Sequence, residues 1–302
     1  MRFGFIVATL IAFWAQSAAA WSSRRALLQS SAAAAFSLAT PAALAADPIL
    51  TSPPDSDTKK LYNEARALES QGNMFAAQRL YAKVTRLAPN FVYAWSSLGN
   101  TQTALGDLNE ADASYTTAVD LCKTADCSDL YILLLNRGSL RLNNGQPDRA
   151  LADLRESDRL RNRPDALVLQ NLARAEEWNG FYAQANEHYD LAIRMTANEV
   201  NPFWLRSAMV KLQLGDVQGG FDLLKRVDNR FSEAPEVRAA YAAFLSFKGD
   251  ATSAQQKFLA IPDRQRLKFV DRTYMTQTIV WPPVLREQLE KVTVAVGDGA
   301  IR

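Results

Sequence analysis

Few residues of this chain have the types and spacing that catalysis requires. His188 is the only histidine, and one imidazole supplies neither a metal site, which needs several convergent ligands, nor a nucleophilic triad. Gly219 and Gly220 stand together without the strand and lysine of a phosphate-binding loop, and the sequence has no zinc spacing or serine elbow. The residues therefore predict no catalytic site, no metal and no cofactor; an enzyme whose chemistry the sequence does not reveal is the alternative.

Cys122 and Cys127 are the only cysteines in the chain. Four residues separate them, which excludes a C-x-x-C redox motif. In an oxidising compartment they can close a small loop, whose short ring adds only about 1 to 3 kcal/mol to stability. Two free thiols are the alternative.

The basic excess of the chain belongs to its first residues. Arg2, Arg24 and Arg25 are the only charged residues before Asp47, so 31 of the 34 Lys and Arg remain beyond them, against 32 Asp and Glu, a net charge near −1. Such a balance does not attract nucleic acid by bulk electrostatics. The apolar fraction of 48% is ordinary for a folded protein.

Residues 1–20 have the order of a secretory signal peptide: Arg2 first, then an uncharged apolar run, then the small triplet at 18–20. Residues 21–45 repeat that order, since Arg24 and Arg25 precede an alanine-rich run that ends in a second A-x-A site. We interpret the second segment as a twin-arginine signal. Each apolar run is about a dozen residues, short of the roughly 20 that span a bilayer, although two transmembrane helices are the alternative.

The tandem resembles the layered presequence of plastids acquired by secondary endosymbiosis, in which a transit stretch opening with an aromatic residue follows the signal peptide. Trp21 stands in that place. The resemblance implies a plastid transit stretch and thylakoid signal within residues 21–45, and delivery to the thylakoid lumen. The transit stretch is very short, because Arg24 follows Trp21 closely, and a periplasmic or secreted protein is the alternative. Residues 46–57 are expected to be a proline-containing linker.

Glycines recur at nearly constant spacing further along the chain, which predicts a stacked array. They are Gly72, Gly106, Gly145, Gly180, Gly215 and Gly249, separated by 34, 39, 35, 35 and 34 residues. Five places after each glycine stands a small residue, which lets two helices approach closely; four places later a large one fills the groove between them. The small residues are Ala77, Ala111, Ala150, Ala185, Gly220 and Ala254, and the large ones are Tyr81, Tyr115, Leu154, Tyr189, Leu224 and Phe258.

The second period, AWSSLGNTQTALGDLNEADASYTTAVDL, carries the pattern most completely. It resembles the tetratricopeptide repeat, whose signature places are occupied by Trp95, Leu98, Gly99, Gly106, Ala111 and Tyr115. Trp204 repeats the role of Trp95 in the fifth period. The resemblance implies an all-α fold, a right-handed superhelical solenoid of about six helix-turn-helix units.

The units are expected at residues 58–91, 92–125, 131–164, 166–199, 201–234 and 235–268, together 58–268. Pro262 should cut the last unit short, because proline breaks a helix interior. Residues 264–280 then have the pattern of one helix, and Pro283 can start another from Val284 to about Val294. Residues 269–302 are therefore interpreted as a helical cap and tail, in which Trp281 either packs or anchors a partner.

In tetratricopeptide proteins the first helices of the units line a concave face that binds segments of other proteins. The partner-binding residues expected from this resemblance are Asn63, Asn100, Asn136, Asn171, Arg174, Trp178, Arg206 and Met209. Asparagine amides can pair with both N–H and C=O groups of an extended peptide. The alternative is that these residues are merely solvent-facing.

An apolar stripe on the same face suits a hydrophobic or amphipathic client, or else packs between neighbouring first helices. Its members are Leu135, Leu142, Leu205, Met209, Leu212 and Phe247. Ser96 and Leu167 stand where chaperone-binding relatives have lysine, so we do not expect binding of acidic chaperone C-termini.

Together these patterns predict a non-enzymatic scaffold that binds proteins or peptides and no nucleic acid. The resemblance to lumenal and plastid members of the family implies assembly or maintenance of a photosynthetic thylakoid complex, with the protein peripheral to that membrane complex. The sequence does not indicate the client or the oligomeric state.

Overall fold

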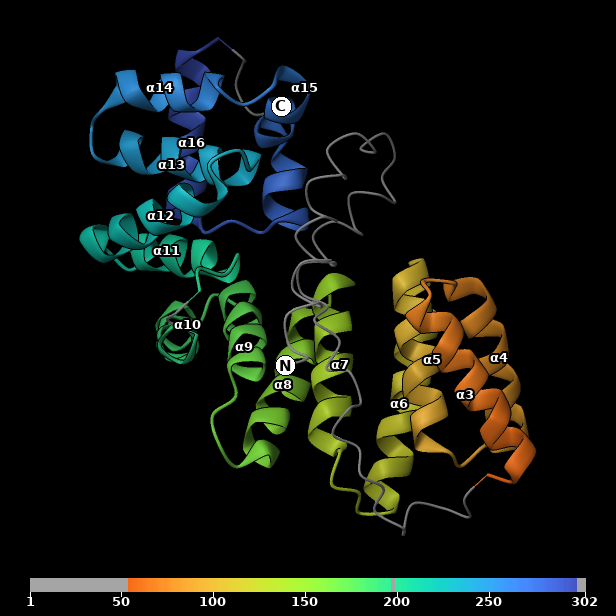
Figure 1. The fold of residues 1–302 in the computed structure, drawn as a ribbon. Helices are drawn as coiled ribbons and strands as arrows, with labels where there is room; N and C mark the ends of the chain where they lie inside the picture. The colour runs from red at the N-terminus through yellow and green to blue at the C-terminus, as the bar shows by residue number, and fades with distance from the viewer. Residues whose placement is uncertain (1–53, 197–198, 298–302) are drawn as a thin grey trace. The chain divides into compact units, whose positions relative to one another are not determined.

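The computed structural model describes residues 54–196 and 199–297. Every regular element in these ranges is helical, which confirms the predicted all-α class (Figure 1). No helix in them has the length and apolar character to cross a membrane. The predicted signal peptide, the transit and twin-arginine segment and most of the linker lie outside the described ranges.

The chain divides into two compact parts between Gln146 and Pro147. The N-terminal part contains α3 (Ser56–Ser70), α4 (Met74–Leu87), α5 (Val92–Leu105), α6 (Leu108–Thr124) and α7 (Leu130–Asn143). In this part each helix packs on the next one along the chain. The first two predicted units thus each contain a pair of packed helices, α3 with α4 and α5 with α6.

Small residues set both the turn and the close approach within the second helix pair. Gly106 ends α5 with φ of 86°, a left-handed conformation that glycine adopts without a Cβ penalty. A Cβ on Gly99 would lie 3.0 Å from the Tyr115 ring, so α5 and α6 touch where the glycine stands. Ala111 and Tyr115 are fully buried in this contact.

The C-terminal part contains more helices, some of them short. They are α8 (Pro147–Arg161), α9 (Ala166–Trp178), α10 (Tyr182–Met195), α11 (Phe203–Gln213), α12 (Val217–Phe231), α13 (Pro235–Phe247), α14 (Ala251–Leu259), α15 (Asp263–Arg266), the 3₁₀-helix η2 (Leu267–Val270), the π-helix η3 (Tyr274–Thr278) and α16 (Pro283–Ala295). Within this part α9 packs on α10, α11 on α12 and α13 on α14, while α16 packs mainly on α13.

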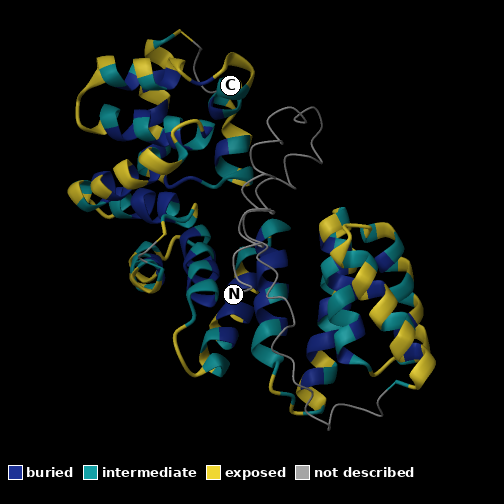
Figure 2. Cartoon of the chain, viewed as in Figure 1, coloured by how far each residue is buried: buried dark blue, intermediate teal, exposed yellow. Residues whose placement is uncertain are grey.

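A large hydrophobic core lies in the C-terminal part. Buried residues of both parts are dark blue in Figure 2. Trp204, Phe244 and Phe258 form the centre of this core together with residues of the tail, including Trp281 and Leu285. The tail therefore contributes to the core and is not an appendage.

One expectation for the tail is corrected. Residues 264–280 do not form a single helix but the three short pieces α15, η2 and η3. Asp271 interrupts the run, because its carboxylate accepts the backbone N–H groups of Thr273 and Tyr274 and starts a new turn. Val280, with φ of 46°, then turns the chain toward α16. The helix before them, α14, ends at Leu259, ahead of Pro262.

Candidate partner-binding face

The first helices of the N-terminal part carry polar residues at equivalent positions. Asn63 on α3 is exposed, and Ser97 on α5 and Asn136 on α7 are half-buried. The Tyr62 hydroxyl lies 3.3 Å from the Ser97 hydroxyl, so these surfaces of α3 and α5 face each other. We call Asn63, Ser97, Asn100 and Asn136 the N-terminal inner face.

Asn100 has a structural contact in addition to its place on this face. Its Oδ1 atom accepts the hydroxyl hydrogen of Tyr115 at 2.5 Å. Burial raises the pKa of Tyr115, so the buried hydroxyl stays protonated and donates. The large residue of the repeat therefore fills the groove and also orients a side chain of the inner face.

In two other helix pairs the repeat tyrosine also bonds across to the preceding helix, but to a glutamate 12 residues earlier, whereas Asn100 stands 15 residues before Tyr115. Tyr81 donates to Glu69 at 2.7 Å, and Tyr189 donates to Glu177 at 3.0 Å. The sequence interpretation missed these contacts because it treated the tyrosines only as fillers. The signal that could have found them is an acidic residue 12 places before a repeat tyrosine.

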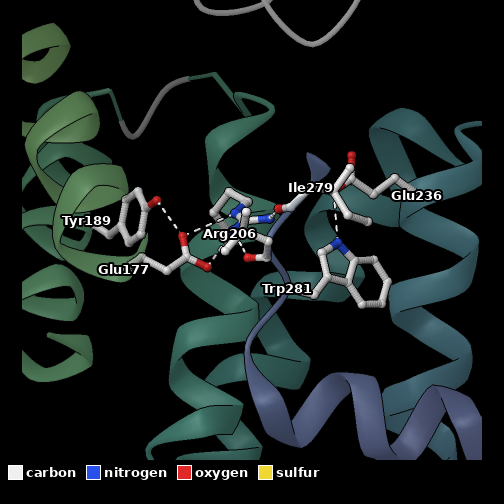
Figure 3. Close-up of polar contacts among 7 residues, drawn as sticks. Glu177, Tyr189, Arg206, Glu236, Ile279 and Trp281 are labelled. Atoms are coloured by element: carbon white, nitrogen blue, oxygen red, sulfur yellow. Dashed lines mark hydrogen bonds and ion pairs between the residues drawn. The ribbon is translucent and has the colours of Figure 1, made fainter. Parts of the chain in front are cut away.

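Glu177 and Arg206 form a buried ion pair in the C-terminal part (Figure 3). The Arg206 Nη2 and Nε atoms lie 2.7 and 3.1 Å from the two carboxylate oxygens of Glu177, and only 1% of the Glu177 side chain is exposed. Burial raises the pKa of Glu177, while Arg206 and the Tyr189 hydroxyl oppose that rise by stabilising the carboxylate. The Glu177 charge in turn raises the pKa of Arg206 against the effect of burial, so the guanidinium stays charged.

Arg206 also binds the chain's own tail. Its guanidinium donates to the carbonyl oxygens of Ile279 and Val280, each at 2.8 Å (Figure 3). The indole Nε1 of Trp281 donates to Glu236 at 3.1 Å, and only 2% of Trp281 is exposed. Arg206 is thus one link between α9, α11 and the tail.

Two further bonds attach the tail to first helices of the C-terminal part. The backbone N–H of Val284 donates to the Gln213 side chain at 3.0 Å, and Ser246 donates to Gln288 at 3.1 Å. Gln213 lies on α11 and Ser246 on α13. The tail therefore packs on α11 and α13, and Trp281 is buried in this packing, as the packing alternative predicts.

The predicted binding residues of the C-terminal part are less exposed to solvent than expected. Met209 is fully buried and Asn171 is 4% exposed, with its amide donating to the Leu167 carbonyl at 2.8 Å. These two do not belong to an accessible face, and Arg206 is occupied by the tail. Arg174 lies over the Trp178 ring, 5.3 Å from its centre.

The predicted apolar stripe is mostly core. The members that are at most 5% exposed are Leu135, Leu142, Leu205, Met209 and Leu212. Phe247 differs, with 40% of its surface exposed. The stripe residues other than Phe247 are therefore buried within the protein and are not available to a hydrophobic client.

His188 and the two cysteines, whose side chains could be reactive, each make a contact or bond within the fold. The His188 Nδ1 atom lies 2.7 Å from the Glu176 carboxylate. Cys122 and Cys127 are joined by a disulfide, so neither is a free thiol. Among the described residues no group of His, Cys, Asp and Glu side chains has the arrangement of a metal site.

Comparison with known proteins agrees with this architecture. The model of the tetratricopeptide repeat family matches residues 92–124, which comprise α5 and α6. No curated protein sequence matches the chain. The pair α5 and α6 is thus similar to a tetratricopeptide repeat, and it contains Trp95 and Tyr115, two of the residues on which the sequence resemblance is based.

Solved structures share the fold at low sequence identity. The Cut9–Hcn1 hetero-tetramer of the APC/C matches with a TM-score of 0.56 at 16% identity, over 78% of this chain and 42% of that chain. PilF of Pseudomonas aeruginosa matches with 0.56 at 16% identity, over 69% and 91%. MamA of Desulfovibrio magneticus RS-1 matches with 0.52 at 16% identity, over 58% and 96%. The described chain thus has a tetratricopeptide-type fold, and the present chain spans less than half of the Cut9 complex chain it matches.

Proposed function

We propose that this protein is a non-enzymatic scaffold that holds segments of partner proteins on its N-terminal inner face. One observation carries the proposal: Arg206 on α11, a first helix of the C-terminal part, binds polypeptide main chain through its bonds to two successive carbonyl groups. There the occupant is the chain's own tail. In the N-terminal part the position equivalent to Arg206 is held by Asn63, Ser97 and Asn136, and Asn63 is exposed.

The chemistry of this face suits an extended segment bound by its backbone. Amide and hydroxyl side chains donate and accept hydrogen bonds, so they can pair with main-chain N–H and C=O groups without selecting particular side chains. The four residues that define the N-terminal inner face are all uncharged, so their own hydrogen bonds do not require a charged partner.

We also propose that the protein acts in the thylakoid lumen, in the assembly or maintenance of a photosynthetic membrane complex. The order of the segments within residues 1–45 supports this address. The Cys122–Cys127 disulfide supports an oxidising compartment, where such bonds persist.

A binding experiment tests the inner face. Residues 46–302 are immobilised and lumenal proteins are captured and quantified for the unchanged chain and for Asn63→Ala/Asn136→Ala. Asn100 is left unchanged, because its loss would leave the buried Tyr115 hydroxyl without its acceptor. We expect the double variant to lose specific clients, and Asn90→Ala, an exposed residue between α4 and α5, to retain them. If all three forms captured the same clients in equal amounts, the proposed face would not be the binding site.

The proposed localisation is tested separately. A fluorescent protein fused after residue 57 is expected to enter the thylakoid lumen, and replacement of both Arg24 and Arg25 by lysine should stop it before the thylakoid membrane. Delivery to the periplasm or the medium would support the secreted alternative and would leave the scaffold proposal intact.

A further inference from the structure

The disulfide lies at the end of α6, where the chain turns toward α7. The N–H of Cys127 donates to the Cys122 carbonyl at 3.0 Å, and the N–H of Asp126 faces the Lys123 carbonyl at 3.4 Å. This pair of bonds is a Schellman motif, in which Asp126 is the left-handed residue, with φ of 52°. Cys122 and Cys127 therefore occupy the two positions of the motif whose side chains ordinarily make a hydrophobic contact.

Other helix ends close in the same way but with glycine. After α5 the N–H of Asp107 donates to the Gln102 carbonyl at 2.9 Å, and the left-handed residue is Gly106. The same bond accompanies a left-handed glycine after α3, α7, α9, α11 and α13. Only glycine adopts this conformation without steric cost. At α6 an aspartate stands in its place, and a covalent bond spans the motif.

The connection that follows is attached to α5. The Tyr93 hydroxyl donates to the Asp129 carboxylate at 2.9 Å. Asp129 is the N-cap residue of α7, and its side chain makes no capping bond because it accepts from Tyr93. This bond holds the start of α7 on α5, directly after the segment that the disulfide closes.

We propose that the Cys122–Cys127 disulfide is a redox site, and that its reduction by a dithiol releases the end of α6 and the connection to α7. The disulfide substitutes for the missing glycine: while it is intact, Asp126 is held in the left-handed conformation. After reduction nothing covalent opposes the return of Asp126 to an ordinary conformation, and the bonds of Cys127 and Leu130 to the preceding turn open with it.

The exposure of the two cysteine residues indicates the direction of the exchange. Cys122 is fully buried and Cys127 is half-buried, so an incoming thiolate attacks the Cys127 sulfur. The S–S bond breaks, and its electron pair goes to the Cys122 sulfur, which takes up a proton. The second thiol of the dithiol then attacks the mixed disulfide, so the reductant leaves as a disulfide and Cys127 leaves as a thiol. The Cys122 sulfur lies 3.6 Å from the Cys127 carbonyl oxygen, which can accept the new S–H group.

Hydrogen exchange of the full chain tests the conformational effect without any client. We expect the amides of Cys127 and Leu130 to exchange roughly tenfold or more faster after treatment with dithiothreitol, as in local opening, while amides of α3 are unchanged. Cys122→Ser/Cys127→Ser should exchange like the reduced chain. Equal exchange before and after complete reduction, or failure of the dithiol to reduce the folded protein, would overturn the proposal.

A glycine variant provides the matched control. In Asp126→Gly the helix end closes without help from the disulfide, so reduction should change exchange at Cys127 much less than in the unchanged chain. An undiminished redox effect in this variant would show that the disulfide does not act through Asp126. The direction of attack is tested with limiting glutathione and peptide mapping: an adduct on Cys127 supports it, and an adduct on Cys122 contradicts it.

Discussion

Arg206 makes two kinds of contact in Figure 3. It neutralises the buried carboxylate of Glu177, and it saturates two carbonyl groups of the tail. A buried ion pair contributes little compared with apolar packing, but removal of one partner leaves an uncompensated charge in the interior. The pair therefore makes the attachment of the tail sensitive to a single substitution.

We predict that Arg206→Ala lowers the free energy of unfolding by about 3 to 5 kcal/mol, because Glu177 loses its counter-charge. Arg206→Lys should recover only part of this loss, since an ammonium group cannot reproduce the planar fork that binds both the carboxylate and the carbonyls. Urea unfolding followed by circular dichroism measures the difference. The exposed Arg163→Ala is the control and should lie within about 0.5 kcal/mol of the unchanged chain; a similarly small effect at Arg206 would contradict the assignment.

His188 gives the C-terminal part a dependence on pH. The hydrogen bond that the protonated His188 imidazole donates to the Glu176 carboxylate holds the pKa of His188 above its ordinary value of 6.5, burial opposes this, and Asp158 and Glu187 add to the rise. A group whose pKa is raised by folding stabilises the folded state below its unfolded pKa and loses that contribution as pH rises through the folded pKa.

We therefore predict that the stability advantage of the unchanged chain over His188→Gln is greatest below pH 6.5 and declines as the pH rises above it. Urea unfolding at a series of pH values measures this advantage. Glu176→Gln should reduce the pH dependence, because the principal partner of the imidazole is then neutral. If the stability advantage over His188→Gln increased with rising pH, the predicted direction of the pH dependence would be wrong.

At the scale of the helices, the sequence pattern predicts the pairs well because their determinants are local. Gly106 and Ala111 specify a turn and a close contact within one unit, and both are read from positions a few residues apart. The contacts between the tail and the first helices are not local in sequence, since Arg206 and Ile279 are 73 residues apart. No periodicity relates these two positions, so the pattern could not show that the tail binds Arg206.

The tail also shows where local patterns fail. Residues 264–280 have enough apolar residues for one helix, but Asp271 caps a new turn within the run and Val280 adopts a left-handed conformation. A β-branched residue is rarely found there unless surrounding contacts hold it. The Arg206 bonds to the carbonyls of Ile279 and Val280 are such contacts.

Two adjacent glycines of α12 allow a test of close helix packing. A Cβ on Gly220 would lie 2.9 Å from the Ala208 carbonyl oxygen, a backbone atom that cannot move aside. A Cβ on Gly219 would meet the side chain of Asp216, which can rotate. Both glycines lie in the first turn of α12, and alanine in place of glycine within a helix is otherwise favoured by about 0.5 to 1 kcal/mol.

We predict that Gly220→Ala destabilises the protein by about 1 to 3 kcal/mol, because overpacking exceeds the gain in helix propensity. Gly219→Ala should be near neutral, since the same gain offsets the lost Asp216 cap at 2.9 Å. Thermal unfolding of both variants provides the comparison. If the two substitutions had equal effects, the small residues of the repeat would not mark close helix contacts.

On the scale of the whole molecule, stability in a repeat array is local, because each unit contacts mainly its neighbours. Here the tail changes that rule within the C-terminal part, since α16 packs on α11, α13 and α14 together. A defect in the tail should therefore reach several helices that are distant in sequence, and the N-terminal part, a separate compact unit, should not share its effect.

Substitution of Trp281 tests this coupling. The indole is 2% exposed and packs near Phe269 and Leu285 in the same core, so we predict that Trp281→Ala costs about 3 to 5 kcal/mol. Hydrogen exchange should accelerate in α11, α13 and α16 and stay unchanged in α3 and α4. A partner anchor would behave differently, because its removal would weaken client capture with little change in exchange. Acceleration of the same size in α3 would mean that the two parts unfold as one cooperative body, and the tail would then stabilise the entire described chain.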